Sequence, residues 1–129
     1  MQLINLAVGA FEQNKRDEGE FVDSIVIAAG QGAVEVRCVH IMPGKRPAER
    51  IEGGVLGELP NGHDHLLIVL GGLGRISGGK TVRAPIEVGQ AAYFPKEEGY
   101  LIFADKPLTG ILIEGSDLAL SLRALQAAA

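Results

Sequence analysis

Short apolar runs separated by glycine-rich turns dominate this sequence and limit the folds open to it. Eighteen of the 129 residues are glycine, a residue that weakens helix interiors and suits tight turns. The runs are rich in β-branched and aromatic residues, which favour strands. They fall at residues 21–29, 33–42, 55–56, 63–70, 73–76, 81–82, 91–94, 100–104 and 108–114. This spacing predicts an all-β protein, a small antiparallel β barrel or jelly-roll sandwich.

The first two long runs predict a hairpin, because only a short Gly-rich turn around Gly30 and Gly32 separates them. In the second run, Val34, Val36, Cys38 and His40 fall on one face of a strand, and the residues between them on the other. Since Val34, Val36 and Cys38 are apolar, we expect their face of the strand, which also carries His40, to point inward.

No linker or internal repeat divides the chain, so we expect one domain over residues 1–129 with its core at about 21–115. The C-terminal segment leaves two alternatives open. Ser116 and Asp117 are suited to cap a short helix over residues 118–127, whereas Leu118, Leu120 and Leu122 alternate as in a strand.

Composition excludes several classes of partner. A net charge of −4 argues against a nucleic-acid binder, and no apolar stretch approaches the roughly 20 residues that span a bilayer. The first residues lack the basic start of a signal peptide. Cys38 is the only cysteine, so no intrachain disulfide can form, and its apolar neighbours predict a buried, inert thiol. We therefore expect a cytoplasmic protein.

Residues 74–81 match the phosphate-loop pattern G-x-x-x-x-G-K-T. That loop works by feeding a helix whose N-terminus holds the phosphates. No helix is expected here, since Pro85 follows closely and Ile86 and Val88 favour a strand. We interpret residues 77–80 as the turn of a β-hairpin.

Two partial motifs place the chain beside a known family. Gly89 is followed after five residues by Pro95, with Glu97 and Tyr100 at the next two motif positions. Upstream, one alignment starts at Gly53 and closes on Gly72. The stretch from Val34 to Glu114 thereby resembles the cupin superfamily, whose fold is a small double-stranded β-helix. The resemblance implies a pocket at the barrel mouth.

The same resemblance implies where a metal would sit. Cupins usually present two His, one Glu and a further His. In the alignment from Gly53, these positions become Leu59, Asn61, His65 and Tyr100. A second alignment, from Gly57, places His63 and His65 on the histidine pair but loses the carboxylate and the closing glycine. We prefer the first alignment, because it keeps the glycines at which the chain must turn.

A histidine metal site remains a hypothesis on separate grounds. His63 and His65 are two residues apart, so both point to one face of a strand, and His40 could join them from another. Three imidazoles suit a divalent transition metal such as zinc, iron, nickel, manganese or copper. The alternative is that no metal is bound and these histidines are solvated or hydrogen-bonded.

We predict that the mouth holds a small molecule, contacted by Asn61, Tyr93, Glu97 and Tyr100. For an enzyme, His65 is the candidate ligand or base and Tyr100 the candidate hydrogen-bond donor. Cupins include isomerases, lyases and oxygenases, so the resemblance selects no reaction. The alternative is a metal-free, non-catalytic module that senses a ligand or dimerises. We expect a homodimer, in which the run Leu3–Leu6 could act as an exchanged edge strand.

Overall fold

A computed structural model describes residues 1–3, 16–17, 22–30, 34–43, 55–58 and 62–116. Within these residues the regular structure is entirely β, and every pair of neighbouring strands is antiparallel. The strands are β1 (Arg16–Asp17), β2 (Val22–Gly30), β3 (Val34–Ile41), β4 (Val55–Glu58), β5 (Asp64–Gly78), β6 (Thr81–Glu87), β7 (Ala91–Phe94) and β8 (Tyr100–Gly115). The predicted all-β class and the β2–β3 hairpin are confirmed.

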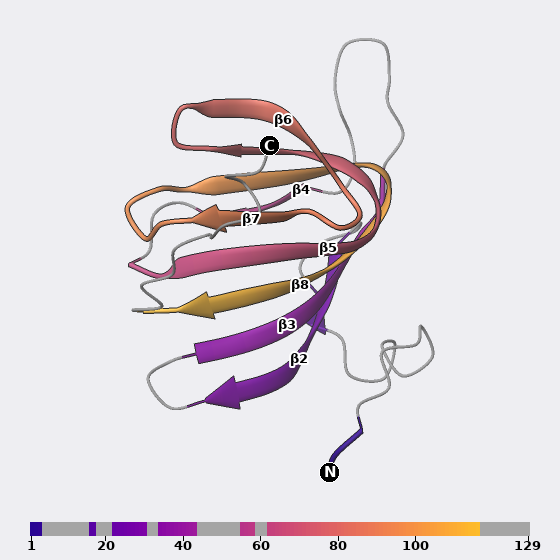
Figure 1. Cartoon of the computed structure of the whole chain (residues 1–129), viewed down its shortest axis with the longest axis vertical. Helices are drawn as coiled ribbons and strands as arrows, with labels where there is room; N and C mark the ends of the chain where they lie inside the picture. Colours follow the sequence, from indigo (N-terminus) through magenta and orange to yellow (C-terminus); the bar gives the residue numbers. More distant parts are fainter. Residues whose placement is uncertain (4–15, 18–21, 31–33, 44–54, 59–61, 117–129) are drawn as a thin grey trace, which may run out of the picture.

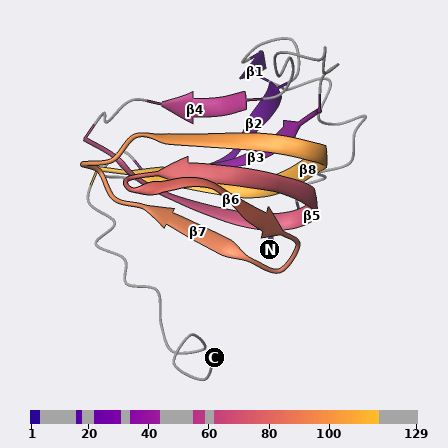
Figure 2. The ribbon, with the colours of Figure 1, turned by 90° about the horizontal axis from the view of Figure 1, so that it is seen from above.

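The two longest strands, β5 and β8, pair along nearly their whole length and carry the other strands on their flanks. Near one end of this pair, β3 joins β8 and β7 joins β5, with β2 beside β3. Near the other end, β4 joins β8 and β6 joins β5. We call β2, β3 and β7, together with the part of the β5–β8 pair that they flank, the first half-sheet. We call β4 and β6, with the other part of that pair, the second half-sheet. Seen from above, β4 and β7 lie on opposite sides of the β5–β8 pair (Figure 2).

Both long strands bend in the middle, which folds one half-sheet over the other (Figure 1). The register of the β5–β8 pair shifts at Val69/Gly71, Gly71/Leu73 and Leu73/Gly74. Such irregularities bend a strand and increase its twist. The expectation that Gly71 and Gly72 separate two strands is therefore wrong, because these glycines bend a single strand without ending it.

The core lies between the half-sheets and draws residues from both. Val39 and Ile41 of β3, and Leu67 and Val69 of β5, belong to the same buried cluster as Ile102 of β8. The inward face of β3 is thus the one that carries Val39 and Ile41, which corrects the expectation from the alternation of Val34 and Cys38. The outer face is apolar as well, so alternation of residue type could not identify the inner side.

A second, smaller cluster explains that apolar outer face. Cys38 and Ile25 are both buried, and Ile27 and Ile111 pack against them. The predicted buried thiol is confirmed, with Cys38 only 1% exposed.

The segment with the phosphate-loop pattern forms a hairpin, as predicted. Residues 74–78 belong to β5, Gly79 and Lys80 form the turn, and β6 begins at Thr81. β6 is an edge strand, which accommodates Pro85, because proline has no backbone N–H to donate and would interrupt the hydrogen bonds of a central strand.

Several expectations fall on residues that the structure leaves undescribed. The C-terminal alternatives at 118–127 lie wholly outside the described residues. Leu3 is described, exposed and not part of a strand, whereas positions 4–6 are outside. Homodimer formation stays a prediction. In the described ranges, no helix has the length and apolar character needed to cross a bilayer.

The bend provides a first testable prediction. Gly72 has φ 89°, and a Cβ built there would overlap the carbonyl oxygen of Pro107 on β8, whereas a Cβ at Gly71 would meet nothing within 4 Å. We expect Gly72→Ala to lower the free energy of unfolding by about 3 kcal/mol, through backbone strain and the clash. Gly71→Ala should change it by less than about 1 kcal/mol. Urea denaturation of both variants measures the difference, and equal effects would contradict the described geometry of the bend.

Burial of Cys38 provides a second prediction. Loss of solvent around the sulfur raises the pKa of the Cys38 thiol. The reactive thiolate therefore forms only at a more alkaline pH than in an exposed cysteine. We expect the native protein to resist a disulfide-exchange reagent at neutral pH, and the urea-unfolded protein to react with one equivalent. Rapid reaction of the native protein would show that Cys38 is accessible.

Candidate functional site

The ends of the two long strands, β5 and β8, gather at the end of the molecule opposite the bends. The first residue of β5, Asp64, pairs with the last residue of β8, Gly115, and the last residue of β5, Gly78, pairs with the first of β8, Tyr100. Because both strands fold back in the middle, all four termini come together at one end of the sandwich (Figure 1). We call this the open end.

A histidine–carboxylate pair lies at the open end of the first half-sheet. His65 of β5 and Glu114 of β8 face each other in the register, and His65 Nε2 lies 2.8 Å from Glu114 Oε2. The His65 side chain is 2% exposed and that of Glu114 is 14% exposed. An ionised carboxylate only accepts hydrogen bonds, so the imidazole donates from Nε2.

Tyr100 brings the second half-sheet into contact with this pair. Its ring centroid lies 4.7 Å from that of His65 and 5.0 Å from that of Phe94, which it stacks against at 23°. The ring of Tyr100 thus fills the space between the half-sheets at the open end. The structure therefore brings together the two residues predicted to be catalytic, His65 and Tyr100.

Sequence reasoning missed Glu114. It ends the apolar run 108–114, and its even number places it on the same side of β8 as the buried Leu112. Glu35 of β3 pairs with Glu114 in the register, and Arg37, 4% exposed, pairs with Leu112. Charged residues that follow the apolar residues on the core-facing side of a strand are the signal that could have identified this polar end of the core.

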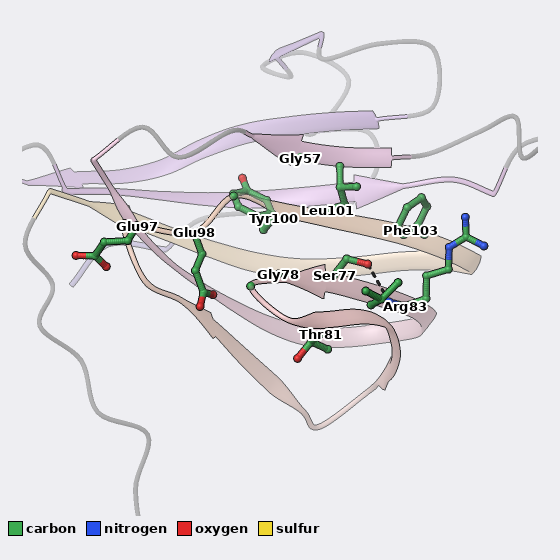
Figure 3. A pocket seen from close by; sticks show the side chains of 13 residues that line it. Gly57, Ser77, Gly78, Thr81, Arg83, Glu97, Glu98, Tyr100, Leu101 and Phe103 are labelled. Atoms are coloured by element: carbon green, nitrogen blue, oxygen red, sulfur yellow. Dashed lines mark hydrogen bonds between the residues drawn. The ribbon is translucent and has the colours of Figure 1, made fainter.

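A surface hollow of about 770 Å³ adjoins the open end on the second half-sheet. Its lining comes from Gly57 and from residues 77–79, 81–83, 97–101 and 103. These belong to β4, β5, β6 and β8 and to the turns that join β5 to β6 and β7 to β8 (Figure 3). Two predicted ligand contacts, Glu97 and Tyr100, line this hollow.

The other two predicted ligand contacts are not brought to the hollow. Tyr93 lies between Ala92 and Phe94, which both belong to the core, so its own side chain points to the outer face of β7. Asn61 lies outside the described residues. Asp64, also near the open end, accepts a hydrogen bond at Oδ1 from the backbone N–H of Lys96, at 2.8 Å, and so ties the loop before β8 to the start of β5.

Solved structures identify the fold. The chain is similar to KdgF from Halomonas sp. (TM-score 0.65, 16% identity, covering 81% of this chain and 89% of that one). It is also similar to the cupin domain of Schizosaccharomyces pombe Cnp3 (TM-score 0.64, 9% identity, 82% and 70%). A third similar structure is the ectoine synthase from P. lautus (TM-score 0.66, 13% identity, 88% and 78%). The chain has the cupin fold. No protein-family model and no curated protein matches the sequence.

The metal that cupins usually hold does not fit the residues described here. No group of three or more His, Cys, Asp or Glu side chains in the described part of the chain lies close enough to hold an ion. Of the four motif positions, the two that are described place His65 beside Tyr100, and a phenol replaces the usual imidazole. The carboxylate of Glu114 is in hydrogen-bond contact with His65 Nε2.

The structure does not bring His40 together with His65. His40 pairs with Thr109 of β8, whereas His65 pairs with Glu114. Five residues along a strand correspond to about 17 Å. His40 also alternates with the core residues Val39 and Ile41, so it lies on the outer face. His63 is half-buried and immediately precedes β5.

The pairing of His65 with Glu114 is testable by a double-mutant cycle. We expect His65→Phe and Glu114→Met to show a coupling of about 1–2 kcal/mol in urea denaturation, because one charged hydrogen bond is lost in either variant. The more exposed bidentate pair Arg75–Asp105, with distances of 2.7 and 3.0 Å, is the control. Its coupling should be clearly smaller, because solvent screens the exposed guanidinium, and is measured with Arg75→Met and Asp105→Ala. Zero coupling for His65 and Glu114 would show that the pair does not form in solution.

Proposed function

We propose that this protein binds a small organic molecule in the hollow at its open end and does so without a metal ion. The observation that carries the proposal is the hollow itself. Its volume of about 770 Å³ lies within the roughly 300–1,000 Å³ of small-molecule sites. It combines apolar side chains such as Leu101 and Phe103 with polar ones such as Ser77 and Glu98, which is the mixture that both holds and orients a ligand.

The fold is consistent with such a role without selecting a ligand. Among the similar structures, the ectoine synthase is by its name an enzyme, and another, from Thermotoga maritima, is described as a predicted oxalate decarboxylase. At 13% and 14% identity these likenesses concern the fold only. The proposal for this chain rests on its own residues.

The donor groups that the structure describes at the open end support binding without a metal. A metal site needs several ligands within about 2–2.6 Å of one point. At the open end the His65 imidazole instead contacts Glu114 through Nε2, and Tyr100 presents a ring. We propose that polar side chains and backbone groups hold the ligand by hydrogen bonds and charge.

Proton transfer by His65 is a second candidate function. The contact of 2.8 Å between His65 and Glu114 favours it, since a carboxylate that fixes an imidazole is a common arrangement for a general base. It ranks below binding, because His65 is buried and contacts the ring of Tyr100 on the core side. A ligand in the hollow would meet the opposite side of β8.

Blocking the hollow tests the proposed function. Thr81 is exposed and lines the hollow, so we expect Thr81→Trp to fill it and to abolish saturation-transfer signals from a library of small organic fragments. Val88 is 58% exposed and lies outside the hollow, so Val88→Trp controls for the added indole. The signals of the unaltered protein should survive treatment with EDTA. Fragment signals that persist in Thr81→Trp, or that vanish with EDTA, would contradict the proposal.

A further inference from the structure

Arg83 has a backbone conformation that the chain otherwise gives to glycine. Its φ is 50°, and the other positive-φ residues in the described ranges are Gly62, Gly72, Gly79 and Gly89. The left-handed conformation is unfavourable for a residue with a side chain, because it brings Cβ too close to the following carbonyl oxygen. Glycine would remove this cost, and the sequence uses it 18 times. The side chain of Arg83 is therefore kept against the local preference of the backbone.

A β-bulge produces this conformation and sets the direction of the side chain. Ile76 pairs with Ala84 and Gly78 with Thr81, so Ser77 alone faces two residues of β6. The backbone N–H of Arg83 donates a hydrogen bond to Ser77 Oγ, at 2.8 Å (Figure 3). Bulges redirect side chains and are frequent beside binding sites. Here the bulge turns Arg83 toward the hollow.

The guanidinium of Arg83 provides a positive charge at one end of the hollow. It lies 5.8 Å from the centroid of the Phe103 ring, within reach of a cation–π contact. Within the described ranges no carboxylate pairs with it. Arg75, on the same side of the half-sheet, is instead held by both oxygens of Asp105. Arg83 is thus the cation of the hollow that can meet an anionic ligand group.

Glu98 provides the negative charge at the opposite end. Figure 3 shows its carboxylate directed to the turn between β5 and β6, while that of Glu97 points away from the hollow. A Cβ at Gly79 would lie 2.5 Å from Glu98 Oε1, so the carboxylate rests directly on this glycine. No cation pairs with Glu98 among the residues that the structure describes. Lys80 occupies the same turn but does not line the hollow.

Apolar surface separates the two charges. Leu101, 43% exposed, and Phe103 lie between Glu98 and Arg83 in Figure 3. Gly78, next to Gly79, pairs with Tyr100, and Tyr100 is three strand residues from Phe103. Three residues correspond to about 10 Å. The hollow therefore has a cation-binding end, an apolar middle and an anion-binding end.

We propose that the hollow selects an elongated zwitterion, with an ammonium group at Glu98, a carboxylate at Arg83 and an apolar chain of about 10 Å between them. This inference rests on the proposed function and adds the chemical class of the ligand. A molecule with only one of the charges leaves the other end of the hollow without a partner, which lowers its affinity.

The ω-amino acid 8-aminooctanoate is the probe, because its two charges are separated by an apolar chain of that length. Octanoate and octylamine each keep one charge, and 4-aminobutanoate keeps both on a shorter chain. We expect calorimetric titration at low salt to show binding of 8-aminooctanoate, and binding at least about five-fold weaker for each of the three others. Added salt should weaken the binding, since both charged ends are near the surface.

Substitutions of Arg83 and Glu98 test which end of the hollow binds which charge of the ligand. Arg83→Gly should abolish the preference for 8-aminooctanoate over octylamine while leaving the melting temperature unchanged or raised, because glycine relieves the backbone strain. A purely structural role for Arg83 would lower the melting temperature instead. Arg83→Lys should retain most of the preference. Glu98→Gln should abolish the preference over octanoate. Lys80→Gln, which removes a charge beside the hollow without altering its lining, should change neither.

The outcomes separate this inference from the proposed function. Equal binding of octanoate or octylamine and 8-aminooctanoate, sensitive to Thr81→Trp, would overturn the selection of a zwitterion but retain a small-molecule site. Wild-type preference in Arg83→Gly would overturn the role of Arg83. Failure of 8-aminooctanoate to bind at millimolar concentration would overturn the inference, and the fragment experiment would then decide the proposed function separately.

Discussion

The pairing of β5 with β8 across a shared bend is the constraint on which the rest of this structure depends. An antiparallel pair of 15 and 16 residues is about 50 Å long when straight, too long for one layer of a small protein. Bending both strands converts the pair into two half-sheets that bury their inner faces against each other. The bend demands a close backbone approach, and Gly72 permits it where a Cβ would overlap Pro107. Without this approach the core residues of the two half-sheets would not meet.

The same bend determines where polar chemistry can lie. At one end of the sandwich β5 and β8 continue through the bend, so the ends of both long strands collect at the other. Residues at the open end have neighbours on one side only, and Glu114 keeps 14% of its side chain exposed while its partner His65 is buried. A charge can be kept there at modest cost, because water still reaches part of it. The charged residues Arg37 and Glu114 of the inward rows accordingly lie towards this end.

Short-range pattern predicted most of the strands, because β-branched runs and glycine turns act locally. It divided β5 because Gly71 and Gly72 look the same in sequence whether a strand ends or bends, and it divided β8 because Asp105-Lys106-Pro107 has the composition of a turn. It also inverted the inner face of β3. Cys38 and Val39 are both buried, Cys38 in the outer cluster and Val39 in the core, so hydrophobic alternation carried no information there.

The resemblance to cupins placed His65 and Tyr100 at two ligand positions of the cupin motifs. The structure places their rings 4.7 Å apart. The pairing of Glu114 with His65 could not be predicted, since it depends on the register of β5 with β8.

Arg83 shows why the site was harder to predict than the fold. Nothing in the local sequence Thr81-Val82-Arg83-Ala84 signals a bulge, because the mismatch arises between two strands and is absent from either alone. In the hollow, the strained residue and the carboxylate over Gly79 lie at opposite ends of one surface. Stability alone would favour glycine at position 83, since strain is relieved and no core contact is lost. A side chain that the fold does not need, held by the fold in an unfavourable conformation, is the pattern expected where binding rather than stability determines the residue.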